Sequence, residues 1–181
     1  MKNLLLAVLI LKTAFSVAQP YYFRHYQVED GLSNNAVVCC LQDNKGFLWF
    51  GTKDGLDRFD GYTFKIFRNI PEDSSSIGSN FIHTLYADKN NMLWVGTDRG
   101  LYSYDATTES FSLLPTPVTA QVTDIAMDNR GNLWFISNFT LYKYHVATKN
   151  LFAFAIEKYF EATSLCSSDD GTVWVTAATG F

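Results

Sequence analysis

The chain has 181 residues, a net charge of −4, and apolar side chains at 48% of its positions. This apolar content excludes an intrinsically disordered chain. The acidic balance gives no support to a protein that binds nucleic acid or an anionic membrane surface. The three cysteines form no disulfide framework, and their spacing matches no metal-binding motif.

The first 18 residues have the features of a secretory signal peptide. A short positive region, Met1-Lys2-Asn3, precedes an apolar stretch from Leu4 to Phe15 that is too short to span a bilayer. Small residues at Ser16 and Ala18 suit a signal peptidase, so we expect cleavage after Ala18. A core helix is the alternative. The signal peptide predicts a secreted or periplasmic protein.

A tryptophan flanked by apolar residues recurs at a nearly constant spacing in the rest of the chain. Trp94 follows Trp49 by 45 residues, and Trp134 and Trp174 follow at further intervals of 40. Periods of about 40 to 45 residues are typical of β-propeller blades. Most repeated residues therefore have a structural explanation before a functional one.

Each tryptophan lies between two predicted turns. An Asp or Ser six residues before the tryptophan suits the first position of a turn, where its side chain bonds the backbone ahead. The residue three before the tryptophan must adopt a left-handed conformation, which favours glycine or asparagine. The repeated structural residues are Trp49, Trp94, Trp134, Trp174, Gly46, Gly51, Gly55, Gly96, Gly100, Gly131 and Gly171.

The segments between the turns are short, aromatic and β-branched, and they alternate, which predicts antiparallel strands. One unit is thus a blade of four strands, and no helix is expected after the signal peptide. We predict an all-β fold of about three and a half propeller blades, in an open arc rather than a closed ring. The predicted segments are an N-terminal strand segment at 19–34, blade 1 at 35–68, blade 2 at 81–114, blade 3 at 122–156 and a partial blade 4 at 162–181.

The cysteines and histidines give no support to catalysis. Cys40 and Cys166 align with core positions of the other repeats, so we expect the cysteines, Cys39 included, to be buried thiols. No histidine pairs in sequence with a candidate nucleophile. We therefore predict no catalytic residue, no metal and no cofactor. The histidines lie in a strand-like segment, at the start of an inner strand and in a turn: His25, His83 and His145.

The stretch from Phe23 to Asn35, followed by that from Gln42 to Tyr62, resembles the start of two-component regulator propeller sensors, and the first blade is the most specific part. The resemblance covers the chain after the signal peptide, and it is weaker in the third and fourth units. In this family, common in Bacteroidetes, propellers precede an immunoglobulin-like domain, a membrane helix, a histidine kinase, a receiver and a helix-turn-helix domain. The resemblance implies a periplasmic sensor of glycan fragments that signals through a phosphorelay.

That resemblance also implies that the chain is a fragment. We expect the missing C-terminal blades, the membrane span and the kinase in a full-length parent, so this chain is not itself an enzyme. In the family, the segment from Tyr22 to Tyr26 would complete the last blade of a ring. Dimerisation, in which two chains combine, is an alternative. An open arc leaves a blade face and strand edges uncovered, which predicts marginal stability and aggregation.

Ligand-binding residues are predicted at the turns between the second and third strands of each blade. These turns lie on the same face as the connectors between blades, and their tips differ from one repeat to the next. Variable loops on a rigid scaffold often bind ligands, and charged side chains there suit acidic or hydroxyl-rich sugars. Solvated turn tips are the alternative. The candidate residues are Lys53, Asp54, Asp98, Arg99 and Asn138.

Two other classes of function stay open, because a fold alone does not settle function. Streptogramin lyases are propeller enzymes with a similar Trp-hydrophobic-Gly-Thr motif, but the three histidines do not assemble the metal site that such an enzyme needs. A structural or protein-binding module is the third class.

Overall fold

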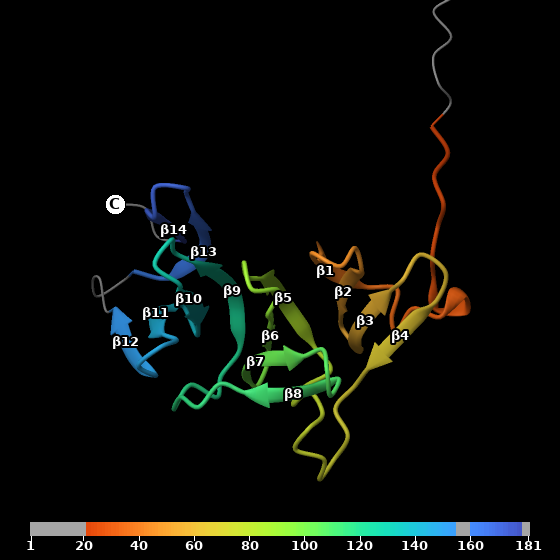
Figure 1. Cartoon of the computed structure of the whole chain (residues 1–181), viewed down its shortest axis with the longest axis horizontal. Helices are drawn as coiled ribbons and strands as arrows, with labels where there is room; N and C mark the ends of the chain where they lie inside the picture. The colour runs from red at the N-terminus through yellow and green to blue at the C-terminus, as the bar shows by residue number, and fades with distance from the viewer. Residues whose placement is uncertain (1–20, 155–159, 179–181) are drawn as a thin grey trace, which may run out of the picture.

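The computed structural model describes residues 21–154 and 160–178. Apart from one turn of 3-10 helix, η1 (Val28–Asp30), its regular structure consists of strands, which confirms the predicted fold class. Figure 1 shows four sheets that stand side by side in an open arc. The predicted signal peptide and its cleavage site lie outside the described residues, as do the last residues predicted for blades 3 and 4.

The first two sheets have four antiparallel strands each, and every strand pairs with the next one in sequence. The first sheet contains β1 (Val37–Gln42), β2 (Leu48–Thr52), β3 (Gly55–Phe59) and β4 (Phe64–Phe67). The second sheet contains β5 (Ile82–Ala87), β6 (Leu93–Thr97), β7 (Gly100–Asp105) and β8 (Ser110–Leu113).

The third sheet repeats this order, and the fourth contains two strands. The third sheet contains β9 (Val122–Met127), β10 (Asn132–Ser137), β11 (Thr140–His145) and β12 (Asn150–Phe154). The fourth sheet contains β13 (Ala162–Ser167) and β14 (Val173–Ala177). The first strands of successive sheets contact one another. Among the described strands, none pairs with the second edge of β14.

Left-handed residues close the hairpin between the first two strands of each sheet, as the sequence predicts. The φ angles are 88° at Gly46, 77° at Gly131 and 87° at Gly171, and Asn91 takes the same role with a φ of 61°. Glycine has no Cβ, and asparagine tolerates this region better than most residues. Before the turn, Asp43 Oδ1 accepts hydrogen bonds from two backbone amides further along the chain.

The repeated tryptophans lie between neighbouring sheets. Trp49 packs against the second sheet and is 2% exposed, and Trp94 packs against the third sheet and is 6% exposed. Trp134 is partly buried beside the fourth sheet. Trp174 is 66% exposed, because no described sheet covers its side of the fourth sheet. The core is therefore a series of interfaces between sheets.

Glycines after the first two tryptophans allow the inner strands to approach closely. A Cβ on Gly51 would lie 2.5 Å from Cys39 Sγ and 2.7 Å from a methyl carbon of Ile82. A Cβ on Gly96 would lie 2.8 Å from the carbonyl oxygen of Val122 in the next sheet. Distances below 3.0 Å are excluded by repulsion, so glycine at these positions sets the spacing of the sheets.

The segment predicted as an N-terminal strand at 19–34 is not a strand within the described residues. Residues 21–27 have no regular structure, and η1 follows them. A strand needs a neighbouring strand for its backbone hydrogen bonds, and none of the described strands pairs with this segment. Tyr26 instead packs edge-on against Phe59 and Phe64 of the first sheet. Figure 1 shows the described residues before η1 leading away from the arc.

The prediction of buried thiols is wrong for two of the three cysteines. Cys40 and Cys166 are exposed, and Cys39 is partly buried between the first and second sheets. Cys40 shares a face with Phe50, its partner in β2, and Cys166 shares a face with Trp174. Within the described residues these are the outer faces of the first and fourth sheets, and no further sheet covers them. Sequence alignment identified core positions but not the faces that lack a neighbour.

Candidate functional site

The arc has two loop-bearing faces. We call the side with the β2–β3, β6–β7 and β10–β11 turns and the connectors between sheets the turn face. The opposite side carries the hairpins that join the first two strands of each sheet, and we call it the hairpin face. Antiparallel strand order places these sets of loops on opposite sides.

On the turn face, Asp54 is held by neighbours in the protein. Its Oδ2 forms an ion pair of 2.9 Å with Arg68 Nη2, and its Oδ1 accepts a hydrogen bond from the side chain of Asn80. Arg68 also donates to the carbonyl oxygens of Asp54 and Ser33. Asp54 thus ties the end of β4 and the connector to the β2–β3 turn.

Asp98 also has a partner. Its Oδ1 lies 2.6 Å from Nε2 of His83, whose ring stacks on Phe81 with the ring centroids 4.3 Å apart. Lys53 Nζ also lies 6.0 Å from the centroid of the Phe81 ring. The connector between the first and second sheets therefore brings Lys53 and Asp98, 45 residues apart in sequence, to one surface.

Arg99 lines two hollows beside the connector from Asn69 to Asn80. The larger, of about 560 Å³, is lined by residues 69–74 and Arg99, and the smaller, of about 280 Å³, also contains Asp98. In the described part of the chain, no carboxylate lies within ion-pair distance of Arg99 or Lys53. The structure thus places four of the five predicted residues around one connector, with two cations able to donate hydrogen bonds outward.

Asn138 stands apart from the other four predicted residues. It occupies the β10–β11 turn with a φ of 49°, and Phe139 follows with a φ of 61°. The backbone at both positions is left-handed, which asparagine tolerates, so Asn138 has a conformational role in this turn. Among the described hydrogen bonds and ion pairs, none joins it to Lys53 or Arg99.

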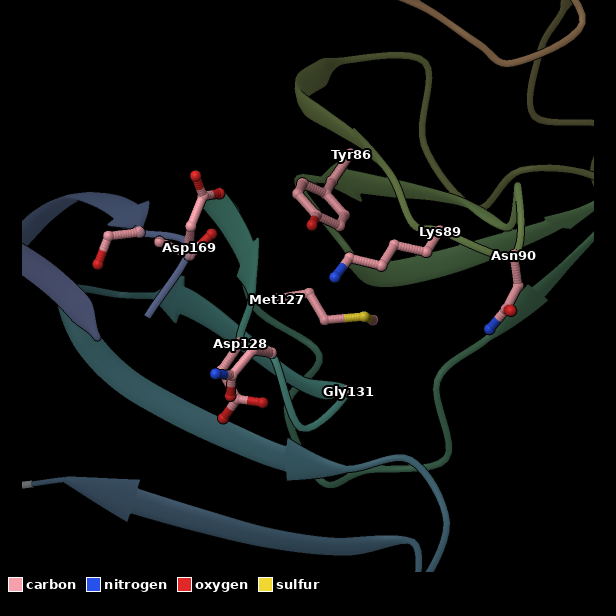
Figure 2. A pocket seen from close by; sticks show the side chains of 10 residues that line it. Tyr86, Lys89, Asn90, Met127, Asp128, Gly131 and Asp169 are labelled. Atoms are coloured by element: carbon pink, nitrogen blue, oxygen red, sulfur yellow. The ribbon is translucent and has the colours of Figure 1, made fainter. Parts of the chain in front are cut away.

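The hairpin face carries a cavity that the sequence did not predict. It has a volume of about 520 Å³ and lies between the inner hairpins of the second, third and fourth sheets. Figure 2 shows Tyr86 and Lys89 on one side, Met127 in the middle and Asp169 on the other side. Other residues of the lining are Asn90, Asp128, Asn129, Gly131, Ser167 and Ser168.

The cavity combines an apolar floor with a polar rim. Tyr86 and Met127 are partly buried and pack against the core between the second and third sheets. Burial raises the pKa of the Tyr86 hydroxyl, with the nearby charge of Asp88 acting in the same direction, so this group stays a protonated donor. Lys89 and Asp169 are exposed at the rim, and no ion pair joins either of them to a described residue.

Asp128 is the buried one of the two carboxylates that line the cavity. Its burial opposes ionisation, but hydrogen bonds from Trp134 and Asn132 outweigh that effect and hold the pKa of Asp128 below its usual value. The carboxylate therefore remains charged, and its donors are all within the third sheet. No signal in a single repeat could reveal this cavity, because its three hairpins are about 40 residues apart.

The described residues offer no metal-binding cluster of three or more His, Cys, Asp or Glu side chains. His83 lies on the turn face beside Asp98, and His145 lies in the third sheet next to Asn132 in the strand register. His25 lies in the segment before η1. The three histidines thus do not converge on one site.

Comparison with known proteins gives matches to signalling propellers. Residues 31–54 and 76–99 each match the family model described as two-component regulator propeller. A curated relative, histidine kinase P4 of Formosa agariphila, is 54% identical over 57 residues, which are 32% of this chain and 4% of that protein. The chain therefore spans only a small part of this relative.

Solved structures of other proteins also match the fold of this chain. The extracellular domain of a protein described as a hybrid two-component system of Bacteroides thetaiotaomicron matches with 28% identity and a TM-score of 0.75, over 86% of this chain and 24% of that one. Virginiamycin B lyase of Staphylococcus aureus matches with 14% identity and a TM-score of 0.62, over 81% of this chain and 50% of that one, a likeness of fold alone. Together, these comparisons show that two stretches of the chain match the two-component regulator propeller model and that the chain resembles the extracellular domain of a hybrid two-component system.

Proposed function

We propose that this chain is part of the ligand-sensing region of a two-component signalling protein and that it works in the periplasm. The Bacteroides domain to which it is similar is extracellular, and the sequence begins with the features of a signal peptide. The full-length parent would be a histidine kinase, with its further blades, membrane span and kinase region outside this chain. Dimerisation of the parent is part of the same proposal.

We further propose that the ligand is a glycan fragment that binds on the turn face. This proposal rests on a difference in ion pairing between the acidic and the basic side chains of the turn face. Asp54 and Asp98 have Arg68 and His83 as partners, whereas Lys53 and Arg99 have no acidic partner among the described residues. Both cations can donate to the hydroxyl or carboxylate oxygens of a sugar, and charge-assisted hydrogen bonds are the stronger ones.

The direct test is binding of the purified chain to a panel of oligosaccharides, followed by calorimetry with Lys53→Gln and Arg99→Gln variants. We expect each variant to weaken binding by about tenfold, as for the loss of a charged hydrogen bond of ~1.5 kcal/mol. Lys149→Gln, in a turn on the hairpin face, is the matched control and should leave the affinity unchanged. Equal affinities for all four proteins would remove Lys53 and Arg99 from the site.

The periplasmic location has its own test. N-terminal sequencing of the exported protein should give Gln19 as the first residue, because cleavage is expected after Ala18. A mature protein that retains Met1 would contradict export by this signal.

A further inference from the structure

We propose that the cavity on the hairpin face is a second binding site and that it takes a neutral sugar ring. This inference deepens the proposed glycan-sensing function by naming a ligand class, and it rests on that function. It concerns a different face of the arc from Lys53 and Arg99. Its lining comes from three successive sheets, and the ligand would bridge them.

The shape of the cavity suits a small sugar. Its volume of about 520 Å³ falls within the range of roughly 300–1,000 Å³ that is usual for small-molecule sites. A sugar ring presents an apolar face of C–H groups and a rim of hydroxyls. The cavity offers the complement, because Tyr86 and Met127 supply apolar surface and the other lining side chains are polar. Figure 2 shows Met127 between Tyr86 and Asp169.

The rim offers both donors and acceptors. Lys89 donates only, Asp169 accepts only, and the Asn90 amide does both. Sugar hydroxyls can serve all three kinds of group at once. A purely apolar ligand that displaced water from the charged rim groups would not replace their hydrogen bonds to water, which is unfavourable.

The charges decide between neutral and acidic sugars. The cavity is lined by two carboxylates, Asp128 and Asp169, and by one ammonium group, Lys89. Asp128 stays ionised because hydrogen bonds from the protein hold its pKa below the usual value. The local balance is therefore negative, and a uronic acid would meet repulsion that a neutral ring does not. The cavity thus differs in preference from the turn face, where two cations lack acidic partners among the described residues.

Binding here has a structural consequence. Lys89 belongs to the hairpin of the second sheet, Asn129 to that of the third and Asp169 to that of the fourth. The Asn129 side chain already donates a hydrogen bond of 3.0 Å to the carbonyl oxygen of Asp170 across two of these hairpins. A bound ring would add contacts between the sheets and stabilise the folded chain by mass action.

The experiment measures thermal unfolding and calorimetric binding of the full chain with four probes. Glucose and galactose are the neutral rings, and glucuronate and galacturonate are the same rings with a carboxylate. We expect at least one neutral ring to bind and to raise the unfolding temperature, and its uronate to bind at least tenfold more weakly at this site. A uronate that binds the cavity as tightly as its neutral partner would overturn the proposal.

Two variants locate the site. Lys89→Met and Asp169→Asn each remove a rim group that faces solvent, so the fold should be retained, and each should weaken binding of the neutral ring by about fivefold. Lys45→Met, in the corresponding hairpin of the first sheet and outside the cavity, is the matched control. Neutral-sugar binding that is insensitive to both rim variants, or absent for both rings, would refute the site.

The outcomes also separate this proposal from the proposed function. Binding of an acidic oligosaccharide that depends on Arg99, with no binding of a neutral ring, refutes the second site and leaves the sensing function in place. The absence of any binding by either class of sugar refutes both.

Discussion

The indole Nε1 of Trp134 donates a hydrogen bond of 3.0 Å to Oδ2 of Asp128, six residues earlier in the chain. The other oxygen of Asp128 accepts the backbone amides of Arg130 and Asn132. One carboxylate thus closes the hairpin turn and fixes the orientation of the tryptophan that packs between sheets. The same pairing occurs between Asp43 and Trp49 and between Asp88 and Trp94.

We expect Asp128→Ala to lower the free energy of unfolding by about 2–3 kcal/mol, because it leaves a partly buried indole, a buried amide and two backbone donors without an acceptor. Denaturant unfolding followed by fluorescence measures this change. Ser168 occupies the equivalent position in the fourth sheet, where its hydroxyl donates to the carboxylate of Asp170 and to the carbonyl oxygen of Thr172 in an exposed hairpin. Ser168→Ala is therefore the control, with an expected loss below about 1 kcal/mol. Equal losses in the two variants would contradict this role of Asp128.

The three cysteines should react at very different rates with an alkylating agent. Cys40 and Cys166 are exposed. Burial raises the pKa of the Cys39 thiol to about 12, so almost none of it is thiolate at neutral pH. We expect mass spectrometry of the native protein to show two alkylated cysteines, and three after unfolding. Rapid labelling of Cys39 in the native protein would show that the first two sheets do not pack as described.

Asp57 gives a pH dependence with a defined sign. It is fully buried and accepts hydrogen bonds from the backbone and the hydroxyl of Ser33. Burial raises its pKa above the ordinary value of 3.8, despite those bonds. Its protonated form is therefore favoured by folding, and this contribution is complete below pH 3.8 and is lost as the pH rises through the raised pKa.

We therefore expect Asp57→Asn to remove this loss of stability above pH 3.8. Other carboxylates, such as Asp60 and Asp105, have lowered pKa values and act in the opposite direction. Their effect cancels in the difference between the unfolding free energies of the variant and of the unsubstituted chain. That difference should shift in favour of the variant as the pH rises from 3.8, and a constant difference would show that Asp57 does not titrate in this way.

Gly96 should not tolerate a side chain. Gly96→Ala places a Cβ 2.8 Å from the carbonyl oxygen of Val122, so the second and third sheets must move apart. We expect a loss of about 1–3 kcal/mol, as for other overpacked interiors. Gly46→Asn is the control, because a Cβ there meets no atom within 4 Å and Asn91 adopts the same left-handed turn. A thermal unfolding series that ranks Gly46→Asn as the more damaging change would contradict this packing.

The exposed face of the fourth sheet should drive self-association. Trp174 is 66% exposed on a sheet face next to the edge of β14, which no described strand covers. We expect sedimentation velocity to show association that grows with concentration, and Trp174→Glu to reduce it. Phe139→Glu is the matched control, since Phe139 is 56% exposed but lies at a turn tip. An unsubstituted chain that is monodisperse at all concentrations would contradict the prediction.

The spacing of the four tryptophans was sufficient to predict the sheets and their order. A hairpin turn depends on neighbours in sequence, so Gly46 and Asn91 could be assigned to left-handed positions from local pattern alone. The prediction of turn-capping aspartates was also local. The local pattern predicted that backbone amides donate to the aspartate side chain. It did not predict the hydrogen bond from the indole of Trp49 to Asp43, because that bond depends on the rotamer of a tryptophan packed against the next sheet.

Burial and binding sites depended on neighbours that are far away in sequence. The alignment of Cys40 and Cys166 with core positions could not show that their faces lack a covering sheet within the described residues. Likewise, the sequence predicted Asp54 and Asp98 as binding residues beside Lys53 and Arg99, and only the structure shows that both acids already contact Arg68 and His83.

The sequence by itself therefore determined the repeat, the strands and the turns, because these follow from periodicity and from backbone preferences over a few residues. Only the tertiary structure decided which faces are covered and where cavities form, because the sheets that create them are brought together by packing across about 40 residues of chain.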